Sequence, residues 1–340
     1  MTSIQAVKAL KGVLREHLDW NGARLTFLAQ FLLALFKVKT VNLAQLATAL
    51  SGRAKVDSNY KRLQRFFRGF GLEQAVIARL VIRLLPIREE PWYLTMDRTN
   101  WKFGRLHINI LLLGVAYKGI AFPLFWTLLR KTGNSNTAER IELMERFLAQ
   151  FPAEKVAALL ADREFVGKAW FAYLMARGIG FRIRAKENTR IPNRNGIPLN
   201  AWRYFGGLAI GESRILPRPR HVWGCSVHVV GMRLEGNEFL ILLTSDSPEG
   251  AIQDYARRWE IETLFACLKT RGFRFEDTHL TDPDRVSKMV ALLAIAFVWA
   301  HQTGEWLHQQ RPIPLKKPCS VDSSPSSAMA LTTCAMPSSI

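Results

Sequence analysis

Residues 91–129, PWYLTMDRTNWKFGRLHINILLLGVAYKGIAFPLFWTLL, decide the fold. The stretch holds three short runs rich in β-branched and aromatic residues, and Gly, Lys and Pro residues bound them. Apolar runs of this length with turn residues between them predict three consecutive β-strands. The runs are residues 91–97, 106–117 and 120–129.

Helical and strand-like segments alternate after these runs. We expect a helix over 138–150, a strand over 156–161, a second helix over 168–177 and a strand over 180–185. Strands that alternate with helices predict a mixed α/β sheet covered on both faces. The fold class is therefore α/β, with a mixed sheet that begins after Pro86.

The rest of the chain is organised around this sheet. Residues 1–85 carry apolar residues at three-and-four spacing, which predicts helices, and residues 186–247 alternate and are rich in turns, which predicts a β-rich insertion. The expected divisions are 1–85, a helical, helix-turn-helix-like domain that is a candidate for DNA binding; 86–185, the first part of the core; 186–247, the insertion; 248–317, the C-terminal helices of the core; and 318–340, a disordered Ser-rich tail.

The helical front end has a helix-turn-helix-like arrangement. Asn42 can cap a helix through Leu50, and Asp57 or Ser58 can cap a second helix through Arg68. The second helix has one basic face, formed by Lys61, Arg65 and Arg68, while Tyr60, Leu63, Phe66, Phe67 and Phe70 supply its apolar remainder. A basic helix face can be plain solvated surface or a DNA contact, and both interpretations stay open at this point.

The charge of the chain narrows the choice of partner. The 340 residues contain 47 Lys and Arg against 28 Asp and Glu, which leaves a net charge of +19 at pH 7. Such a charge predicts a polyanionic partner, either the phosphate backbone of nucleic acid or an acidic membrane surface. The chain lacks a signal-peptide layout, and the apolar run 289–300 predicts a core helix of twelve residues that is too short to cross a bilayer. These features favour nucleic acid and argue against a membrane.

Two aspartates stand at the ends of expected strands. Asp97 follows the run 93–96 and Asp162 follows the run 156–161. A carboxylate at such a place needs a cation, a capping role or solvent. Asp97 could pair with Arg98, and Asp162 could cap the next helix or pair with Arg163, so neither acid by itself indicates catalysis.

A polar stripe lies on an expected helix near the C-terminal end of the core. In the stretch 254–273, DYARRWEIETLFACLKTRGF, Tyr255, Arg258, Glu262 and Lys269 follow one another at spacings of three, four and seven. At 100° per residue these four residues line one side of a helix. A solvated Arg–Glu pair would be the ordinary explanation of two of them.

The four spaced residues resemble the signature helix Y-x-x-R-x-x-x-E-x-x-x-x-x-x-K of DDE transposases of the insertion-sequence-four family of bacteria. The segments MDRTNWKFG and LLADREFVG resemble the first-aspartate and second-aspartate segments of that family, and SNYKRLQRFFR is also similar to it. The resemblance covers roughly residues 20–317. It implies an RNase H-like core, a β-rich insertion between the second Asp and the Glu, and divalent-metal chemistry.

The resemblance also implies roles for single residues. Asp97, Asp162 and Glu262 would be the catalytic metal ligands for Mg²⁺ or Mn²⁺, held as two ions about 3.5–4 Å apart. Tyr255, Arg258 and Lys269 would contact DNA phosphates near the cleaved end. The implied partners are the double-stranded DNA of the terminal repeats and the target, and a second copy of the chain on paired ends.

The implied reaction is cut-and-paste transposition in the bacterial cytoplasm, at the nucleoid. It comprises nicking at the element's end, attack by the freed 3′-hydroxyl to form a hairpin, hairpin opening and joining to target DNA. Trp223 and Trp202 are candidates to stack on a flipped base, although both could simply be packing residues. Glu164 and Glu260 are competing acids; Glu260 points off the stripe.

Two alternatives stay open from the sequence. One is a helix-turn-helix DNA-binding regulator with a non-catalytic α/β partner domain, which needs neither metal nor Glu262. The other is an inactive, decayed transposase, because the Ser-rich tail resembles an out-of-frame version of the basic, aromatic segment with which relatives usually end.

Overall fold

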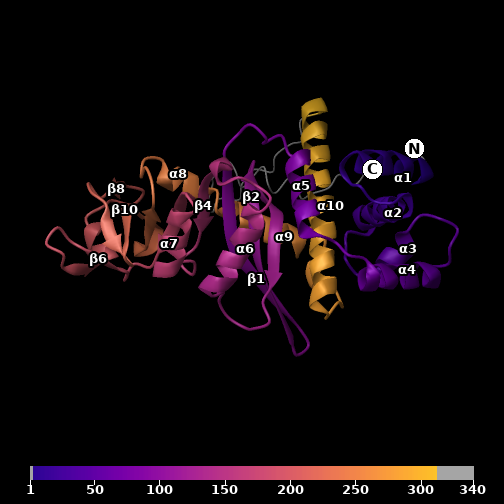
Figure 1. Cartoon of the computed structure of the whole chain (residues 1–340), viewed down its shortest axis with the longest axis horizontal. Coiled ribbons are helices and arrows are strands. Elements are labelled where there is room, and N and C mark those ends of the chain that lie inside the picture. Colours follow the sequence, from indigo (N-terminus) through magenta and orange to yellow (C-terminus); the bar gives the residue numbers. More distant parts are fainter. Residues whose placement is uncertain (1–2, 312–340) are drawn as a thin grey trace.

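The computed structural model describes residues 3–311, so the tail predicted for 318–340 lies outside the described residues. The chain forms a row of three parts: N-terminal helices, a central mixed sheet with helices on both faces, and a β-rich end (Figure 1). Helices α5 (Gln74–Leu84) and α10 (Pro283–Gln310) pack on each other and on the sheet at strand β3, between the N-terminal helices and the sheet.

One large sheet runs through the core and the β-rich end. Its order is β3-β2-β1-β4-β5-β11-β10-β8, and β9 pairs with β10 off this path. β4 and β5 run parallel to β1, whereas the other neighbours are antiparallel. The strands are β1 (Trp92–Phe103), β2 (Leu106–Tyr117), β3 (Ile120–Leu128), β4 (Val156–Ala161), β5 (Phe181–Ala185), β8 (Ser213–Ile215), β9 (Arg220–Val222), β10 (Cys225–Arg233) and β11 (Phe239–Thr244). The prediction of a mixed α/β sheet is confirmed.

The three predicted strands exist, and local turn chemistry explains the connection between the last two. Lys118 and Gly119, with φ of 49° and 85°, form a two-residue turn between the paired residues Tyr117 and Ile120. Two positive φ angles suit the type I′ turn that matches strand twist, which is why a glycine stands at the second position.

The predicted end of the first strand is wrong. β1 does not stop at Asp97 but continues to Phe103, because it stays paired with β2 as far as Phe103 and Leu106. Its parallel pairing with β4 does end at Met96 and Ala161. Asp97 therefore lies within a strand but just beyond the parallel part of the sheet, and Asp162 lies at a true strand end.

Helices α6 (Thr137–Leu148) and α7 (Lys168–Ala176) connect the parallel strands on one side of the sheet, and α9 (Trp259–Leu268) covers the other side (Figure 1). Both connecting helices match their predictions to within about two residues. α6 begins with a capping box, in which the Asn136 side chain accepts from the Glu139 amide and Glu139 accepts from the Asn136 amide. This local signal explains why α6 begins where it does.

The segment from residue 248 to 308 is less continuous than predicted. α8 (Ala251–Ala256) ends before α9 begins, and Arg257 and Arg258 form a turn between them. Between α9 and α10 the chain is irregular apart from the 3₁₀ helix η4 (Phe275–Asp277).

The predicted twelve-residue core helix is part of α10, which has 28 residues. Residues 289–298 are buried, as predicted, but Trp299 and Ala300 are only partly buried, and the predicted length of twelve residues is wrong. Among residues 3–311, α10 alone is long and apolar enough to cross a bilayer, and α2 with α3 passes the same test only as a pair bent by 105°. Since 67% of the apolar window of α10 is buried inside the protein, burial in the core explains its composition.

The N-terminal part consists of α1 (Ser3–His17), α2 (Gly22–Val38), α3 (Leu43–Ala49) and α4 (Val56–Gly69). Asn42 caps α3, as predicted, and its side chain accepts from two backbone amides. The predicted cap of the next helix is wrong: α4 follows Lys55, which makes no side-chain cap bond, and Asp57 and Ser58 lie inside its first turn. The buried Asn59 side chain donates to the Ala47 carbonyl at 3.2 Å and ties α4 to α3.

α4 presents the predicted basic face to solvent. Lys61, Arg65 and Arg68 are all exposed, and Leu63 and Phe67 are buried on the opposite side. Tyr60 was predicted to pack on the apolar side of the helix, but it is 37% exposed. A helix with this division can bind a polyanion without losing its packing.

The β-rich region does not fold apart from the core. β11 pairs with β5, so β11, β10 and β8 prolong the same sheet. Two short strands, β6 (Arg190–Pro192) and β7 (Pro198–Asn200), form a separate hairpin. The remaining 3₁₀ helices are η1 (Ala153–Lys155), η2 (Ala201–Tyr204) and η3 (Glu235–Asn237).

Candidate active site

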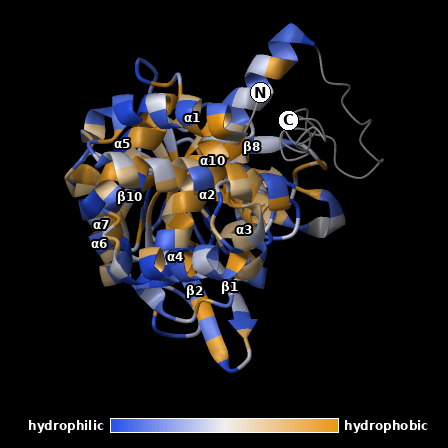
Figure 2. Cartoon of the chain, turned by 90° about the vertical axis from the view of Figure 1, so that its right-hand side faces the viewer, coloured by the Kyte–Doolittle hydropathy of each residue, from blue (hydrophilic) through white to orange (hydrophobic). Residues whose placement is uncertain are grey.

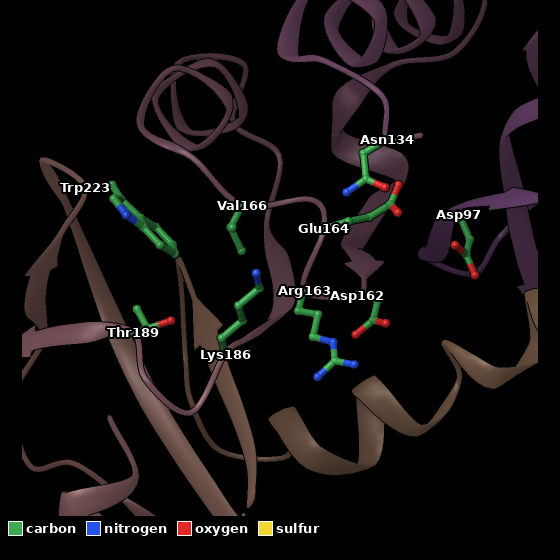
Figure 3. Close-up of a pocket in the computed structure, with 9 residues that line it drawn as sticks. All are labelled: Asp97, Asn134, Asp162, Arg163, Glu164, Val166, Lys186, Thr189 and Trp223. Atoms are coloured by element: carbon green, nitrogen blue, oxygen red, sulfur yellow. The ribbon is translucent and has the colours of Figure 1, made fainter. Parts of the chain in front are cut away.

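Asp97 and Asp162 come together at the carboxyl end of two adjacent parallel strands. Met96 of β1 and Ala161 of β4 are the last parallel partners, and the two aspartates follow them directly. Both line a cavity of about 570 Å³, in which they lie at one end and Trp223 and Lys186 lie toward the other (Figure 3). The other lining residues are Asn134, Arg163, Glu164, Val166 and Thr189.

The Asp97 carboxylate sits in a partly dry environment. Its Oδ1 accepts from the Arg98 amide at 2.7 Å, and its Oδ2 lies 3.7 Å from Arg258 Nη1. Burial raises the pKa of Asp97 to about 6, even though the Arg98 amide and the Arg258 charge both favour the ionised form. The site therefore holds a carboxylate whose charge is only partly compensated.

Asp162 has an oxygen with no partner. Its Oδ1 is buried and accepts no hydrogen bond from residues 3–311. It does not cap α7, because Gly167 is the N-cap residue of that helix and no side chain caps it. A buried acceptor left without a partner costs about 1–3 kcal/mol. An oxygen-binding cation would satisfy this oxygen, so Asp162 fits the chemistry of a metal ligand.

Arg258 connects the third acid to the first. Its guanidinium lies 2.6 Å from Glu262 Oε1 and 3.7 Å from Asp97 Oδ2, and its side chain is only 5% exposed. The arginine thus places one positive charge between two of the three predicted ligands. Within residues 3–311, no three His, Cys, Asp or Glu side chains are arranged closely enough to hold a metal ion.

The other two residues of the predicted stripe, Tyr255 and Lys269, lie in different environments. Tyr255 is buried, its hydroxyl has no hydrogen-bond partner among the described residues, and burial raises its pKa above the usual range. Lys269 lies past the end of α9, where its ammonium group donates to the Asn100 carbonyl and pairs with Glu276, each at 3.0 Å. The helical stripe is interrupted because α8 and α9 are separate helices.

Glu260 is separated from the other acids, as its position off the stripe predicted. It is buried against the backbone amides of Tyr117 and Gly119 at the β2–β3 turn, and burial raises its pKa to about 7. It is absent from the cavity lining.

Glu164 lines the cavity but is already engaged. Its two carboxylate oxygens accept from Arg98 at 3.2 and 3.1 Å. The same guanidinium donates to Asn109 and Asn134, so this pair anchors the loop that carries Asn134 to the cavity. Glu164 is therefore a structural residue beside the candidate ligands.

We expect Glu164→Gln to keep strand cleavage within about tenfold of the wild-type rate and to lower the free energy of unfolding by about 1–3 kcal/mol, because a partly buried ion pair becomes a weaker hydrogen bond. Thermal melting and a cleavage assay check the two effects. Loss of cleavage without loss of stability would make Glu164 a ligand.

Lys186 and Asn134 line the cavity but were not predicted from the sequence. Lys186 follows β5 directly, just as Asp162 follows β4, so its strand-end place was a usable signal. Asn134 comes from the loop between β3 and α6, where no local pattern points to the cavity. Trp223 lies at the cavity, in a two-residue turn with Gly224 between β9 and β10. Trp202 is 41% exposed and is not among the lining residues.

The fold and the cavity define an α/β protein with an acidic site at the carboxyl edge of its parallel strands. Residues 85–299 match the family described as "Transposase DDE domain", and the chain belongs to this family.

The chain is similar to a piggyBac transposase seen by cryo-EM in a synaptic complex with hairpin DNA, with 12% identity, a TM-score of 0.46, and coverage of 97% of this chain and 75% of that chain. No curated protein matches the chain.

Proposed function

We propose that the chain is an active DNA-cutting and DNA-joining transposase of the insertion-sequence-four type, acting at the ends of a bacterial insertion sequence. The observation that carries the proposal is the convergence of Asp97 and Asp162 on one cavity, with Glu262 linked to Asp97 through Arg258, in a chain of the DDE transposase family. The order β3-β2-β1-β4-β5 around these acids supports an RNase H-like core.

Asp97, Asp162 and Glu262 are the residues that would hold the metal. Bound there, a pair of Mg²⁺ or Mn²⁺ ions would supply an activated water or 3′-hydroxyl and charge stabilisation for the leaving oxygen. The unpartnered Asp162 oxygen and the partly compensated Asp97 charge support this assignment. Glu262 would complete the set if its pairing with Arg258 were exchanged for a metal ion.

The other side of the cavity suits nucleic acid. Arg163, next to Asp162, and Lys186, farther from the aspartates, line it with positive charge, and Trp223 adds an aromatic face at the far end (Figure 3). Cations of this kind bind and orient a phosphate, and an aromatic ring stacks on an unpaired base. This arrangement supports cut-and-paste transposition through a hairpin intermediate, with Trp223 preferred over Trp202 as the base-stacking residue.

DNA that extends beyond the cavity would be bound by other surfaces of the protein. The exposed basic face of α4, formed by Lys61, Arg65 and Arg68, would contact the terminal repeat from the N-terminal domain. Lys269 is held beside β1, and Tyr255 packs under Arg258, so both support the strand that carries Asp97 and the arginine next to it. A homodimer on paired ends, working at the nucleoid in the cytoplasm, completes the proposal.

Metal dependence tests the proposal against the two alternatives. The purified chain is incubated with a plasmid that carries the genomic DNA flanking its own gene, with Mg²⁺ or with EDTA. We expect strand cleavage only with Mg²⁺ and DNA binding in both conditions, because phosphate contacts by Lys and Arg do not need the ions. Binding without cleavage in Mg²⁺ and in Mn²⁺ would instead identify a regulator or an inactive transposase.

A further inference from the structure

The β1–β2 hairpin extends beyond every other strand of the sheet. β4 leaves β1 at Met96, and β3 leaves β2 at Ile110, while the β1–β2 pairing continues to Phe103 and Leu106. Residues 101–108 therefore form a two-stranded ribbon with no third strand, which projects from the body of the protein in two perpendicular views (Figures 1 and 2). A ribbon without a third strand needs other contacts to hold its direction.

One side of the ribbon is fixed to the segment that follows α9. Trp101 is buried and packs on Phe275, with ring centroids 4.8 Å apart. The ring centroids of Phe103 and His279 lie 5.2 Å apart. Lys269 donates to the Asn100 carbonyl at the base of the ribbon. These contacts give the ribbon a defined direction.

The segment that supports the ribbon also contacts the N-terminal helices. The Phe273 carbonyl accepts from the Val41 amide at 3.1 Å, and the rings of Phe273 and Phe36 lie 6.3 Å apart. The ribbon and the domain that carries α4 are thus braced on one short segment.

The other side of the ribbon is exposed and basic. Lys102 and His107 are cross-strand partners on this side, Arg105 stands in the turn, and all three are exposed. No Asp or Glu occurs between Arg98 and Ala138, so no acidic residue of the ribbon offsets these charges. An exposed cationic ribbon with a fixed direction is suited to a polyanion.

We propose that this ribbon lies in a groove of the DNA duplex bound at the acidic cavity, with Lys102 and Arg105 on its phosphates. A two-stranded β-ribbon is one of the two elements that the major groove admits. Six residues separate Asp97 from Phe103, which is roughly 20 Å along a strand. That length corresponds to about six base pairs, or half a turn of the same duplex. The inference rests on the proposed function, because it assumes that DNA lies at the cavity.

The salt dependence of binding to a labelled 40-base-pair duplex of random sequence tests the ribbon. The slope of log K against log salt concentration is negative. The Lys102→Ala/Arg105→Ala variant is expected to reduce its magnitude by roughly 2, since each lost phosphate contact removes about 0.9. The control, Lys8→Ala/Arg15→Ala, removes two exposed charges from α1 and should leave the slope unchanged. Lys102→Glu/Arg105→Glu should weaken binding further, with an unchanged melting temperature.

Two results would overturn the ribbon proposal: an unchanged slope in the ribbon variant, or an equal fall in the α1 control, which would indicate a general charge effect. The result is separable from the proposed function. If the wild-type chain cleaves DNA but the ribbon variant keeps its slope, the ribbon proposal fails alone. If the slope falls but the wild-type chain never cleaves, the DNA contact stands and the catalytic proposal fails.

Discussion

Asp97→Asn is expected to reduce strand cleavage by about 10³-fold or more while leaving the protein folded. The amide that replaces the carboxylate removes a charge and one metal-binding oxygen. Loss of several kcal/mol of transition-state stabilisation corresponds to a rate loss of this size, since 1.36 kcal/mol is tenfold. Asp162→Asn should have an effect of the same order, because Asp162 lies beside Asp97 on the neighbouring strand. Cleavage of the flanking-DNA plasmid in Mg²⁺ measures both.

The melting temperature of Asp97→Asn distinguishes loss of a metal ligand from unfolding of the protein. Burial raises the pKa of Asp97 to about 6 from its ordinary value of 3.8, so its ionised form destabilises the metal-free fold. Its contribution to stability is fully present below pH 3.8 and is lost as the pH rises through 6. At pH 7 the neutral Asn should therefore leave the melting temperature of the metal-free protein unchanged or raise it.

Asp284→Asn is the matched control, because Asp284 is exposed near the start of α10 and should affect neither cleavage nor stability. Cleavage that survives in Asp97→Asn would remove Asp97 from the metal site. An equal loss in Asp284→Asn would show that the assay responds to charge alone.

Local chemistry explains which parts of the fold could be predicted. β4 has the predicted bounds, because a continuous apolar run of this length between turn residues is typical of a buried strand and short for a helix. The Asn42 cap likewise depends on a few neighbouring residues. The length of β1 could not be predicted in this way, since it depends on pairing with β2 beyond Asp97.

The candidate site, like the fold, could be predicted only where short sequence patterns determine it. The apolar runs predicted that Asp97 and Asp162 each end a strand, which holds for Asp162 only, and the parallel register of β1 and β4, which no run predicts, brings the two acids together. No spacing rule could place Arg258 between Asp97 and Glu262, because that contact joins a strand to the turn between two helices. The ideal helical stripe also hid the break before α9 and the end of α9 at Leu268, beyond which Lys269 reaches β1 and not the cavity.

Arg258→Gln is expected to strengthen metal binding and weaken cleavage. In the structure the single guanidinium charge partly compensates Asp97 and Glu262, two of the three proposed ligands. A divalent ion must compete with this charge for the same oxygens. Two unit charges about 4 Å apart interact by roughly 4 kcal/mol at an effective dielectric of 20, so even a partial loss of competition should raise Mn²⁺ affinity by about tenfold or more.

The metal-free variant should also be less stable than the wild type. Without Arg258, Asp97 and Glu262 face each other without a cation, but Glu262 is 42% exposed and water screens it. We therefore expect a loss of only about 1–2 kcal/mol, less than for a fully buried pair. Added Mn²⁺ should restore the melting temperature more strongly in the variant than in the wild type.

Electron paramagnetic resonance of free Mn²⁺, without DNA, measures the binding directly. Arg257→Gln is the matched control, since Arg257 is the exposed neighbour whose guanidinium lies over the Tyr93 ring, and its loss should leave Mn²⁺ affinity unchanged. Equal or weaker Mn²⁺ binding in Arg258→Gln would show that the arginine does not compete with the ions.

In Arg258→Gln the affinity for Mn²⁺ should rise while the rate of DNA cleavage falls. These opposite changes would distinguish a role in catalysis from a role in stability. If Asp97 and Glu262 held the ions, the guanidinium would be available to a phosphate of the DNA at the cleaved end, and glutamine cannot supply that charge. Cleavage should therefore fall although the metal binds better, and Arg258→Lys should recover part of it. A residue that only stabilised the fold would lower metal binding and cleavage together, because both would follow the folded fraction.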